Sequence, residues 1–144
     1  MSAPEKAAAV SPFEWRPELL LHVDQIDRQH EELLLRANAL NEALNAEAPR
    51  HEIEARLSEL TSFTAMHFRS EEESMRAHNY EKYATHEAAH RKLLDQIQLV
   101  RGDLLNGKVS SCRMLTRFIE AWTNHHITGT DRELAAFLRS RCDA

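Results

Sequence analysis

The chain has 144 residues, with 18 Lys or Arg, 23 Asp or Glu and a formal net charge of -5. This length is typical of one domain, so we expect residues 1–144 to form a single domain. The mild acidity argues against a nucleic-acid or anionic-membrane partner, since both require a basic patch. Hydrophobic residues make up 42% of the chain, which is enough for a globular core. No apolar run reaches the roughly 18 residues of a membrane-spanning helix.

The first residues of the chain and its cysteines both indicate the cellular compartment of the protein. The first ten residues, MSAPEKAAAV, contain no apolar region long enough for a secretory signal. The two cysteines, Cys112 and Cys142, make no disulfide framework. We therefore expect a cytoplasmic protein with two free thiols, and a disulfide under oxidation is the alternative. Cys112 lies near the expected start of a helix, where the helix N-terminus can lower a thiol pKa.

Proline, glycine and asparagine divide the chain into an arm and several amphipathic stretches. Residues 1–17 hold three of the four prolines and are expected to be irregular. Asp24 is a candidate N-cap for the first long helix, and Gly107 follows the end of the third. Gly129 interrupts the fourth, and a short last helix is expected at about 131–141. The four long helices are expected at about residues 24–46, 50–77, 81–105 and 110–128.

Apolar residues in the four long stretches recur in alternating steps of three and four, which is the pattern of a buried helix face. The first stretch shows this pattern when position 30 is included: Ile26, His30, Leu33, Ala37, Leu40 and Leu44. Four such helices with short connections form an up-down-up-down antiparallel bundle. The sequence therefore predicts an all-α four-helix bundle with an irregular N-terminal arm and a short C-terminal helix.

Polar residues interrupt all four apolar stripes, and every interruption includes a histidine. They are His30, His67, Glu71, His86, His90 and His126. Burial of an unpaired imidazole or carboxylate costs several kcal/mol. One histidine on an apolar face is usually a hydrogen-bonded core residue, but five on four facing stripes are better explained by a shared site. A metal would satisfy their lone pairs and balance the carboxylate charge.

The spacing of two pairs supports a common metal site. His67 and Glu71 are four residues apart, and so are His86 and His90. Residues at this spacing lie on one helix face and can reach a common point. Each pair alone is a weak signal, whereas the pairs together on facing stripes are a strong one.

Asp131 can join this site only if the fourth helix departs from regular geometry. It follows His126 by five residues, which on an α-helix places it about 140° around the axis. A wider or broken helix would be tolerated at Gly129, and π-bulges often occur at functional sites. His125 is the alternative to His126, since a step of three from Trp122 selects it. The five-residue step to Asp131 favours His126.

The donor types constrain the metal. Five imidazoles and two carboxylates without a thiolate disfavour a structural zinc site, which takes four ligands and often cysteine. Seven ligands exceed the needs of one ion and suit two ions bridged by carboxylates. Imidazole and carboxylate with an open position suit iron that handles oxygen. The carboxylate-rich di-iron bundles use Glu-x-x-His pairs, which are missing from these stripes, so the predicted site is a histidine-rich variant.

Four segments stand out in the chain: FEWRPELLLHVDQIDRQH, HFRSEEESM, YEKYATHEAAH and WTNHHITGTD. In their order and spacing the chain resembles the hemerythrins, specifically the bacterial single-domain type, over about residues 13–138. The resemblance implies a cofactor of two iron ions with an oxo or hydroxo bridge. It implies that His86, His90 and His126 hold one iron, that His30 and His67 hold the other beside an open position, and that Glu71 and Asp131 bridge them.

The resemblance also implies reversible O2 binding, for storage, delivery or sensing. The oxygen pocket would be lined by Leu33, Phe68, Trp122, Thr123 and Ile127, and the alternative for each is ordinary core. Thr123 departs from the family, which usually has leucine there, and His22 departs where a small residue is usual. The Thr123 hydroxyl either bonds back to a helix carbonyl or admits a water.

The remaining functional expectations are less specific. A di-iron enzyme acting on peroxide or nitric oxide is the first alternative to an oxygen carrier, and an iron-handling module is the second. We expect a monomer that is not primarily an enzyme, with O2 as its partner and no nucleic-acid or membrane partner. Surface or outer positions are expected for His22, His51, His78 and His125, and a solvated face for Glu72 and Glu73.

Overall fold

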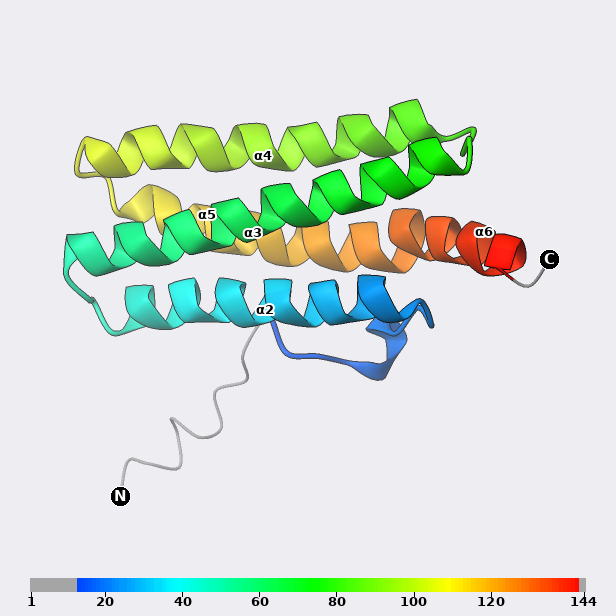
Figure 1. Ribbon diagram of the computed structural model, residues 1–144. Helices are drawn as coiled ribbons and strands as arrows, with labels where there is room; N and C mark the ends of the chain where they lie inside the picture. Colours follow the sequence, from blue (N-terminus) through cyan, green and yellow to red (C-terminus); the bar gives the residue numbers. More distant parts are fainter. Residues whose placement is uncertain (1–12, 143–144) are drawn as a thin grey trace, which may run out of the picture.

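Four long helices lie side by side in the computed structural model, which describes residues 13–142 (Figure 1). They are α2 (Asp24–Asn45), α3 (Arg50–Ala77), α4 (Tyr83–Leu105) and α5 (Ser110–His125). A short 3-10 turn, η1 (Pro17–Leu19), precedes them, and α5 continues through a π-helical segment, η2 (His126–Asp131), into α6 (Arg132–Cys142). Contacts between α2 and α3, α3 and α4, α4 and α5, and α2 and α5 close the bundle. The predicted all-α four-helix bundle is confirmed.

The first long helix begins differently from the prediction. Asp24 is its first helical residue rather than its N-cap, and Val23 before it makes no side-chain capping bond. Asp27 instead organises this end of the helix. Its carboxylate accepts hydrogen bonds from the backbone N–H groups of Leu21, at 2.8 Å, and His22, at 2.9 Å. These bonds tie the preceding segment to the first turn of α2.

The three connections between the long helices share one backbone motif. Glu47, Asn79 and Gly107 have φ values of 53°, 55° and 83°, in the left-handed region. In each connection the next N–H group reaches a carbonyl five residues back: Ala48 to Ala43, Tyr80 to Met75, and Lys108 to Asp103. This is the Schellman motif, which satisfies carbonyls at a helix end and reverses the chain. The sequence indicates a helix end at Gly107 and a break at Asn79, whereas Glu47 gives no such signal.

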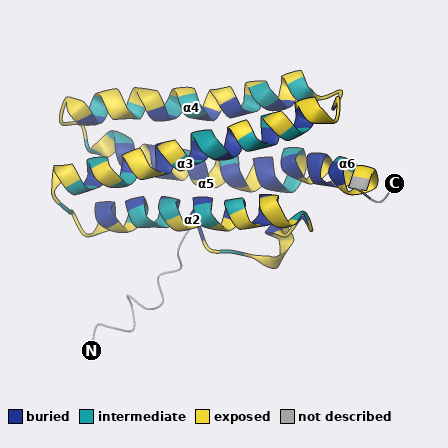
Figure 2. Cartoon of the chain, viewed as in Figure 1, coloured by how far each residue is buried: buried dark blue, intermediate teal, exposed yellow. Residues whose placement is uncertain are grey.

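The predicted stripes form the core, as the buried inner faces of the helices show (Figure 2). The composition of these stripes divides the bundle into two halves. We call the end with the α2–α3 and α4–α5 connections the apolar half. Fully buried aliphatic side chains fill it, including Leu40, Leu44, Leu57, Leu60, Ile97 and Leu104. Burial of each such side chain contributes about 1.5–3 kcal/mol. The polar half lies toward the α3–α4 connection and η2, and holds the buried histidines.

The segment before α2 lies against the bundle. The Phe13 and Leu19 side chains are buried. The Arg132 guanidinium donates a hydrogen bond to the Glu18 carbonyl at 2.6 Å, and Arg139 donates to the Leu21 carbonyl. The predicted irregular arm therefore includes a packed part, and its residues 1–12 lie outside the described residues.

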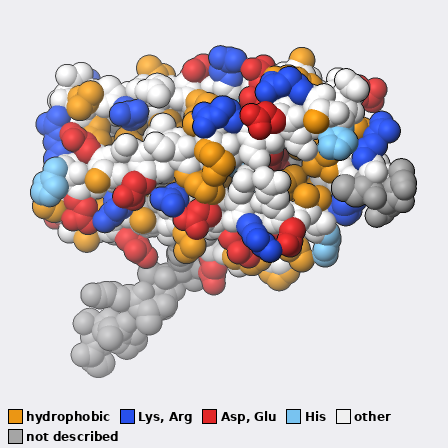
Figure 3. Space-filling model, in the orientation of Figure 1, with side chains coloured by type: hydrophobic (Ala, Val, Ile, Leu, Met, Phe, Trp, Pro, Cys, Tyr) orange, Lys and Arg blue, Asp and Glu red, His pale blue; other side chains and the backbone are white. Residues whose placement is uncertain are grey.

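The outer surface carries charges of both signs. Figure 3 shows basic and acidic side chains intermixed over the visible face, with hydrophobic groups between them. Within residues 13–142, no helix combines the length and the apolar character needed to cross a bilayer.

Candidate metal centre

Seven buried polar side chains converge in the polar half. They are His30 from α2, His67 and Glu71 from α3, His86 and His90 from α4, and His126 and Asp131 from η2. Their nitrogen and oxygen atoms form two groups, and the atoms within each group lie within 4.8 Å of one another. These are the seven side chains singled out in the sequence. The antiparallel helices bring them to the same level of the bundle.

Glu71 belongs to both groups and presents one carboxylate oxygen to each. Its Oε2 lies 3.1 Å from Nε2 of His67 and 3.6 Å from Nε2 of His30. Its Oε1 lies 3.1 Å from Nε2 of His90 and 3.3 Å from Nε2 of His86. The carboxylate thus stands between the two sets of imidazoles.

Asp131 repeats this arrangement from the opposite side of the bundle. Its Oδ2 lies 3.0 Å from Nε2 of His30, whereas its Oδ1 lies 3.0 Å from Nε2 of His86 and 3.1 Å from Nε2 of His126. We call the group with His30 and His67 the two-histidine position, and the group with His86, His90 and His126 the three-histidine position. Both carboxylates are shared between the two positions.

The π-helical segment explains how Asp131 reaches the centre. The wider turn of η2 places Asp131 on the same side as His126, where a regular α-helix would turn it away. The predicted irregularity is confirmed. Of the two adjacent histidines, His126 is buried at the centre and His125 is exposed. Gly129 is not required for space, because a Cβ there would meet no atom within 4 Å.

The inward-facing atoms fit a site for cations. Several have no well-aligned hydrogen bond within the described part of the chain: Nε2 of His30, His86 and His126, Oε2 of Glu71, and Oδ1 of Asp131. An unsatisfied buried polar atom costs about 1–3 kcal/mol. A cation in each group would accept the imidazole lone pairs and balance the carboxylate charge. The donor set of imidazole and carboxylate suits a transition metal.

The two carboxylates also control protonation in the metal-free centre. Burial alone would lower the pKa of His30 and of His86, but the close approach of the Asp131 and Glu71 carboxylates raises these pKa values to about 10 and about 9. Burial would raise the pKa of Glu71, yet the surrounding imidazoles hold it well below its ordinary value. Protons therefore occupy nitrogen atoms that a metal would need, and metal binding must displace them.

Comparison with known proteins assigns the chain to a family. Residues 21–138 match the family described as the hemerythrin HHE cation binding domain. The chain belongs to the hemerythrin family. The bacteriohemerythrin of Methylococcus capsulatus (strain Bath) is 31% identical over 106 residues, which cover 74% of this chain and 80% of that protein. A hemerythrin-like protein of Naegleria gruberi is 29% identical over 128 residues, covering 89% and 95%.

Solved structures agree with this assignment. The crystal structure of a wild-type hemerythrin has a TM-score of 0.78 and 28% sequence identity, covering 85% of this chain and 95% of that one. A mutant hemerythrin reaches a TM-score of 0.81 at 27% identity, covering 88% and 97%. The hemerythrin bundle therefore accounts for nearly the whole described part of the chain.

In this hemerythrin bundle, two side chains contact the outward-facing Nδ1 atoms of the inward-pointing imidazoles. The sequence analysis predicted neither contact. The Glu72 carboxylate lies 2.9 Å from Nδ1 of His90. The Gln29 side-chain oxygen lies 2.6 Å from Nδ1 of His67. The predicted solvated position of Glu72 is wrong, since its side chain is only 17% exposed, whereas Glu73 is exposed as predicted. The one available signal is that each of the two residues directly adjoins a candidate ligand in sequence.

Aromatic rings cover the three-histidine position. Phe68 stacks on His90 with ring centroids 3.8 Å apart and an interplanar angle of 5°. Trp122 stacks on His126 at 4.1 Å and 14°. Of the five residues predicted to line an oxygen pocket, Trp122 is half-buried, and the buried ones are Leu33, Phe68, Thr123 and Ile127. Their role in oxygen binding stays a prediction.

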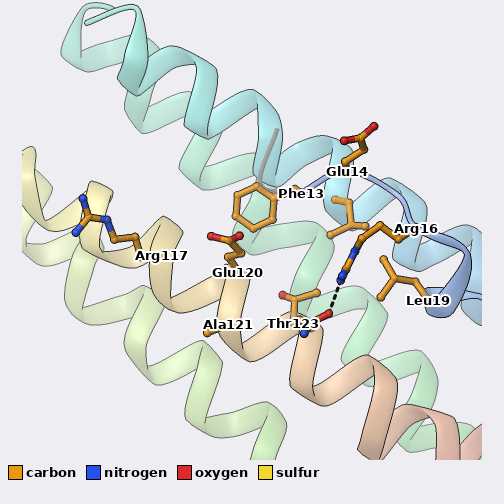
Figure 4. A pocket seen from close by; sticks show the side chains of 10 residues that line it. Phe13, Glu14, Arg16, Leu19, Arg117, Glu120, Ala121 and Thr123 are labelled. Atoms are coloured by element: carbon orange, nitrogen blue, oxygen red, sulfur yellow. Dashed lines mark hydrogen bonds between the residues drawn. The ribbon is translucent and has the colours of Figure 1, made fainter. Parts of the chain in front are cut away.

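Thr123 has a hydroxyl that its own helix does not satisfy. The residue is buried, and Oγ1 has no hydrogen-bond partner within the described residues, so the alternative of a bond back to a helix carbonyl is wrong. Thr123 lines a pocket of about 610 Å³ between α2, α5 and the segment before α2. Arg16 and Glu120 project into the same pocket, and Arg16 bonds the side chain of Asn124 (Figure 4).

The cysteines differ from the prediction in one respect. Cys112 is free and fully buried at the start of α5. Burial raises the pKa of its thiol, and the charge of Asp103 raises it further. The predicted lowering by the helix N-terminus is therefore wrong. The side chain of Cys142 lies outside the described part of the chain.

Proposed function

We propose that this protein binds O2 reversibly at two iron ions held by the seven converging side chains. The observation that carries this proposal is the placement of the Glu71 and Asp131 carboxylates. Each carboxylate directs one oxygen toward one set of imidazoles and its other oxygen toward the second set. Two carboxylates in this arrangement suit a bridged pair of ions. Membership of the hemerythrin family and the bacteriohemerythrin relative support iron and O2.

The residues would divide the work between the two positions. His86, His90 and His126 would hold one ion with three imidazoles, and His30 and His67 would hold the other with two. The two-histidine position has fewer protein donors and therefore leaves room for an exogenous ligand. Glu71 and Asp131 would join both ions. When bound, a ferrous pair with a solvent-derived oxo or hydroxo bridge would supply two electrons for the reversible reduction of O2.

The surrounding side chains control access of water and protons. Leu33, Phe68 and Ile127 are buried apolar groups that offer water no hydrogen bond. A dry lining favours reversible binding because it keeps proton donors away from reduced oxygen. The bundle also fixes the imidazoles in place before any ligand arrives, which limits reorganisation on binding.

An optical spectrum of the anaerobically reduced protein, before and after exposure to air, tests the proposal. We expect a charge-transfer band that appears in air and disappears under vacuum, with two irons per chain by metal analysis. Irreversible oxidation without such a band would contradict reversible O2 binding. Fewer than two irons after anaerobic loading would favour the iron-handling alternative.

The buried hydroxyl of Thr123 is the observation that favours a second candidate, a di-iron enzyme acting on peroxide or nitric oxide. The unpartnered hydroxyl offers a hydrogen bond to a small polar molecule, which an all-apolar lining would not. Steady turnover of hydrogen peroxide or nitric oxide by the iron-loaded protein, supplied with a reducing dye, would favour this candidate. Stable cycling between air and vacuum without turnover would favour the carrier.

The proposal also covers the compartment and the oligomeric state of the protein. We propose a cytoplasmic monomer that stores, delivers or senses O2. Free, buried Cys112 and the mixed charges of the surface are consistent with it. Sedimentation equilibrium of the iron-loaded protein would test the monomer directly.

A further inference from the structure

The two positions differ in how their imidazoles are held from behind. At the two-histidine position, Nδ1 of His67 faces the amide oxygen of Gln29 at 2.6 Å. At the three-histidine position, Nδ1 of His90 faces the carboxylate of Glu72 at 2.9 Å. Each position therefore has one imidazole with an outer acceptor, and these acceptors differ in charge. Within the described residues, His30 and His86 have no hydrogen bond at Nδ1.

Both acceptors favour the imidazole form that carries a hydrogen on Nδ1. Nε2 of each ring faces an oxygen of Glu71 at 3.1 Å. An acceptor at Nδ1 keeps a hydrogen on Nδ1, so that Nε2 is the nitrogen that offers its lone pair when a metal replaces its proton. A carboxylate does more than an amide, because its negative charge makes the imidazole a stronger donor to a metal. Glu72 thus orients and strengthens His90, whereas Gln29 only orients His67.

Packing makes the contact with Glu72 effective. The His90 ring lies flat against Phe68, at 3.8 Å and 5°, which restricts tilting of the ring out of the plane in which it meets the carboxylate. His67 has a looser contact with the same ring, at 5.8 Å and 46°. The Glu72 side chain is mostly shielded from solvent, at 17% exposed, which limits screening of its charge by water and salt.

We propose that Glu72 is a positioning residue that tightens the three-histidine position through His90 and so widens the difference in affinity between the two metal positions. This inference rests on the proposed function in that the centre must bind two ions. A difference in affinity gives the two ions different roles. The ion at the three-histidine position stays in place, whereas the ion at the two-histidine position exchanges its exogenous ligand. Three imidazoles already bind a metal more tightly than two, and Glu72 increases this difference in affinity.

An exchange of the two outer acceptors isolates this effect. Glu72→Gln removes a negative charge behind His90, Gln29→Glu adds one behind His67, and the double variant keeps the net charge of -5. Anaerobic titration of the metal-free protein with Co2+ gives two affinities from the visible bands. Half-loading with 57Fe2+ and Mössbauer spectroscopy then show which position fills first.

The expected changes are specific to position. Glu72→Gln should weaken the three-histidine position about 10-fold or more, within the range typical of outer partners of metal ligands, and leave the other unchanged. Gln29→Glu should tighten the two-histidine position. The double variant should narrow or reverse the order of filling. Glu73→Gln is the matched control, since it removes the same charge from an exposed neighbour on α3, and should change neither affinity.

A second variant separates orientation from charge. Glu72→Ala removes the acceptor, and nitrogen NMR of the metal-free protein should then show His90 losing its Nδ1–H form, which Glu72→Gln should keep. The proposal is overturned if Glu72→Gln weakens both positions equally, or changes affinity no more than Glu73→Gln. If the unaltered protein binds fewer than two Co2+ ions, the proposed function itself fails. If Glu72→Ala does not fold, the two glutamine variants and the exchange still decide the matter.

Discussion

The apolar and polar halves of the bundle are equally buried for opposite reasons. Leu40 and Ile97 are 0% exposed in one half, and His30 and Glu71 are 0% and 2% exposed in the other. Burial of aliphatic groups is favourable in itself, at about 25 cal/mol per Å². Burial of imidazoles and carboxylates is unfavourable until something satisfies them. The same four helices therefore contain one half in which burial is favourable without a ligand and one half in which burial becomes favourable when a ligand satisfies the polar groups.

Removal of a shared carboxylate should disrupt the polar half most. Glu71→Ala takes away an oxygen from both positions, so we expect loss of both irons, with the apolar half still folded. His30→Ala should mainly empty the two-histidine position. Iron counts per chain, with circular dichroism as the control for folding, check both variants. Two irons retained in Glu71→Ala would show that this carboxylate does not bridge.

Removal of iron should have the next largest effect. A ligand that binds only the folded state at a thousand times its Kd stabilises that state by about 4 kcal/mol. We expect the metal-free protein to melt at a lower temperature, with hydrogen exchange faster in the polar half than in the apolar half. Equal melting temperatures for the two forms would contradict a dependence of the polar half on metal.

The pH dependence of stability should also separate the metal-free and metal-loaded forms. In the metal-free fold the pKa values of His30 and His86 are about 10 and about 9, above the ordinary 6.5. Groups with a raised pKa stabilise the fold fully below their unfolded pKa, and this contribution disappears as pH rises through the folded value. The metal-free protein should lose stability between pH 7 and pH 10, whereas the loaded protein should not.

Denaturant unfolding of both forms across this range measures the difference. Metal binding at pH 7 should also release protons into a weakly buffered indicator solution, and this release should vanish above about pH 10. Parallel pH profiles for the two forms, or no proton release at pH 7, would show that His30 and His86 do not hold protons in the metal-free centre.

A small cavity in the apolar half should affect stability alone. Ile97→Val removes one methylene from a fully buried site and should cost about 0.5–1.5 kcal/mol. Iron content and the optical spectrum should be unchanged, because Ile97 lies about two helical turns along α4 from His90. Chemical denaturation and metal analysis of the same sample provide the test. Loss of iron in this variant would mean that the two halves are coupled more tightly than their composition suggests.

The smallest expected effect concerns Thr123. Thr123→Leu removes the buried hydroxyl that has no hydrogen-bond partner within the described residues, and with it a place where water can bind. We expect a longer lifetime of the oxygenated form, because water promotes loss of reduced oxygen as peroxide. The decay of the optical band in air measures this lifetime. An unchanged or shorter lifetime with full iron content would show that the hydroxyl does not control water access.

The helices and the seven converging residues could be predicted because each leaves a local signal. An apolar stripe with a period near 3.6 indicates a helix, and a histidine within such a stripe is an anomaly that requires an explanation. His30 and His126 were found in this way. Asp131 was found because its five-residue spacing suits no regular helix but suits a π-bulge.

The missed features leave no such signal. Glu72 is one of three consecutive glutamates on a charged helix, and only the three-dimensional position of α4 shows that it meets His90. Glu47 adopts a left-handed backbone angle because the packing of adjacent helices demands a reversal there. At Cys112 the nearby helix N-terminus was visible in the sequence, whereas the stronger effect of burial was not.

The π-helical segment makes the length of a helix part of the metal site. Beyond η2, α6 buries Leu134 and Ala135 in the core. Deletion of one residue from η2 would turn all later residues by about 100° around the helix axis. Asp131 would leave the centre, and the apolar face of α6 would leave the core with it. The position of this carboxylate therefore depends on the number of residues in η2 as much as on which residues they are.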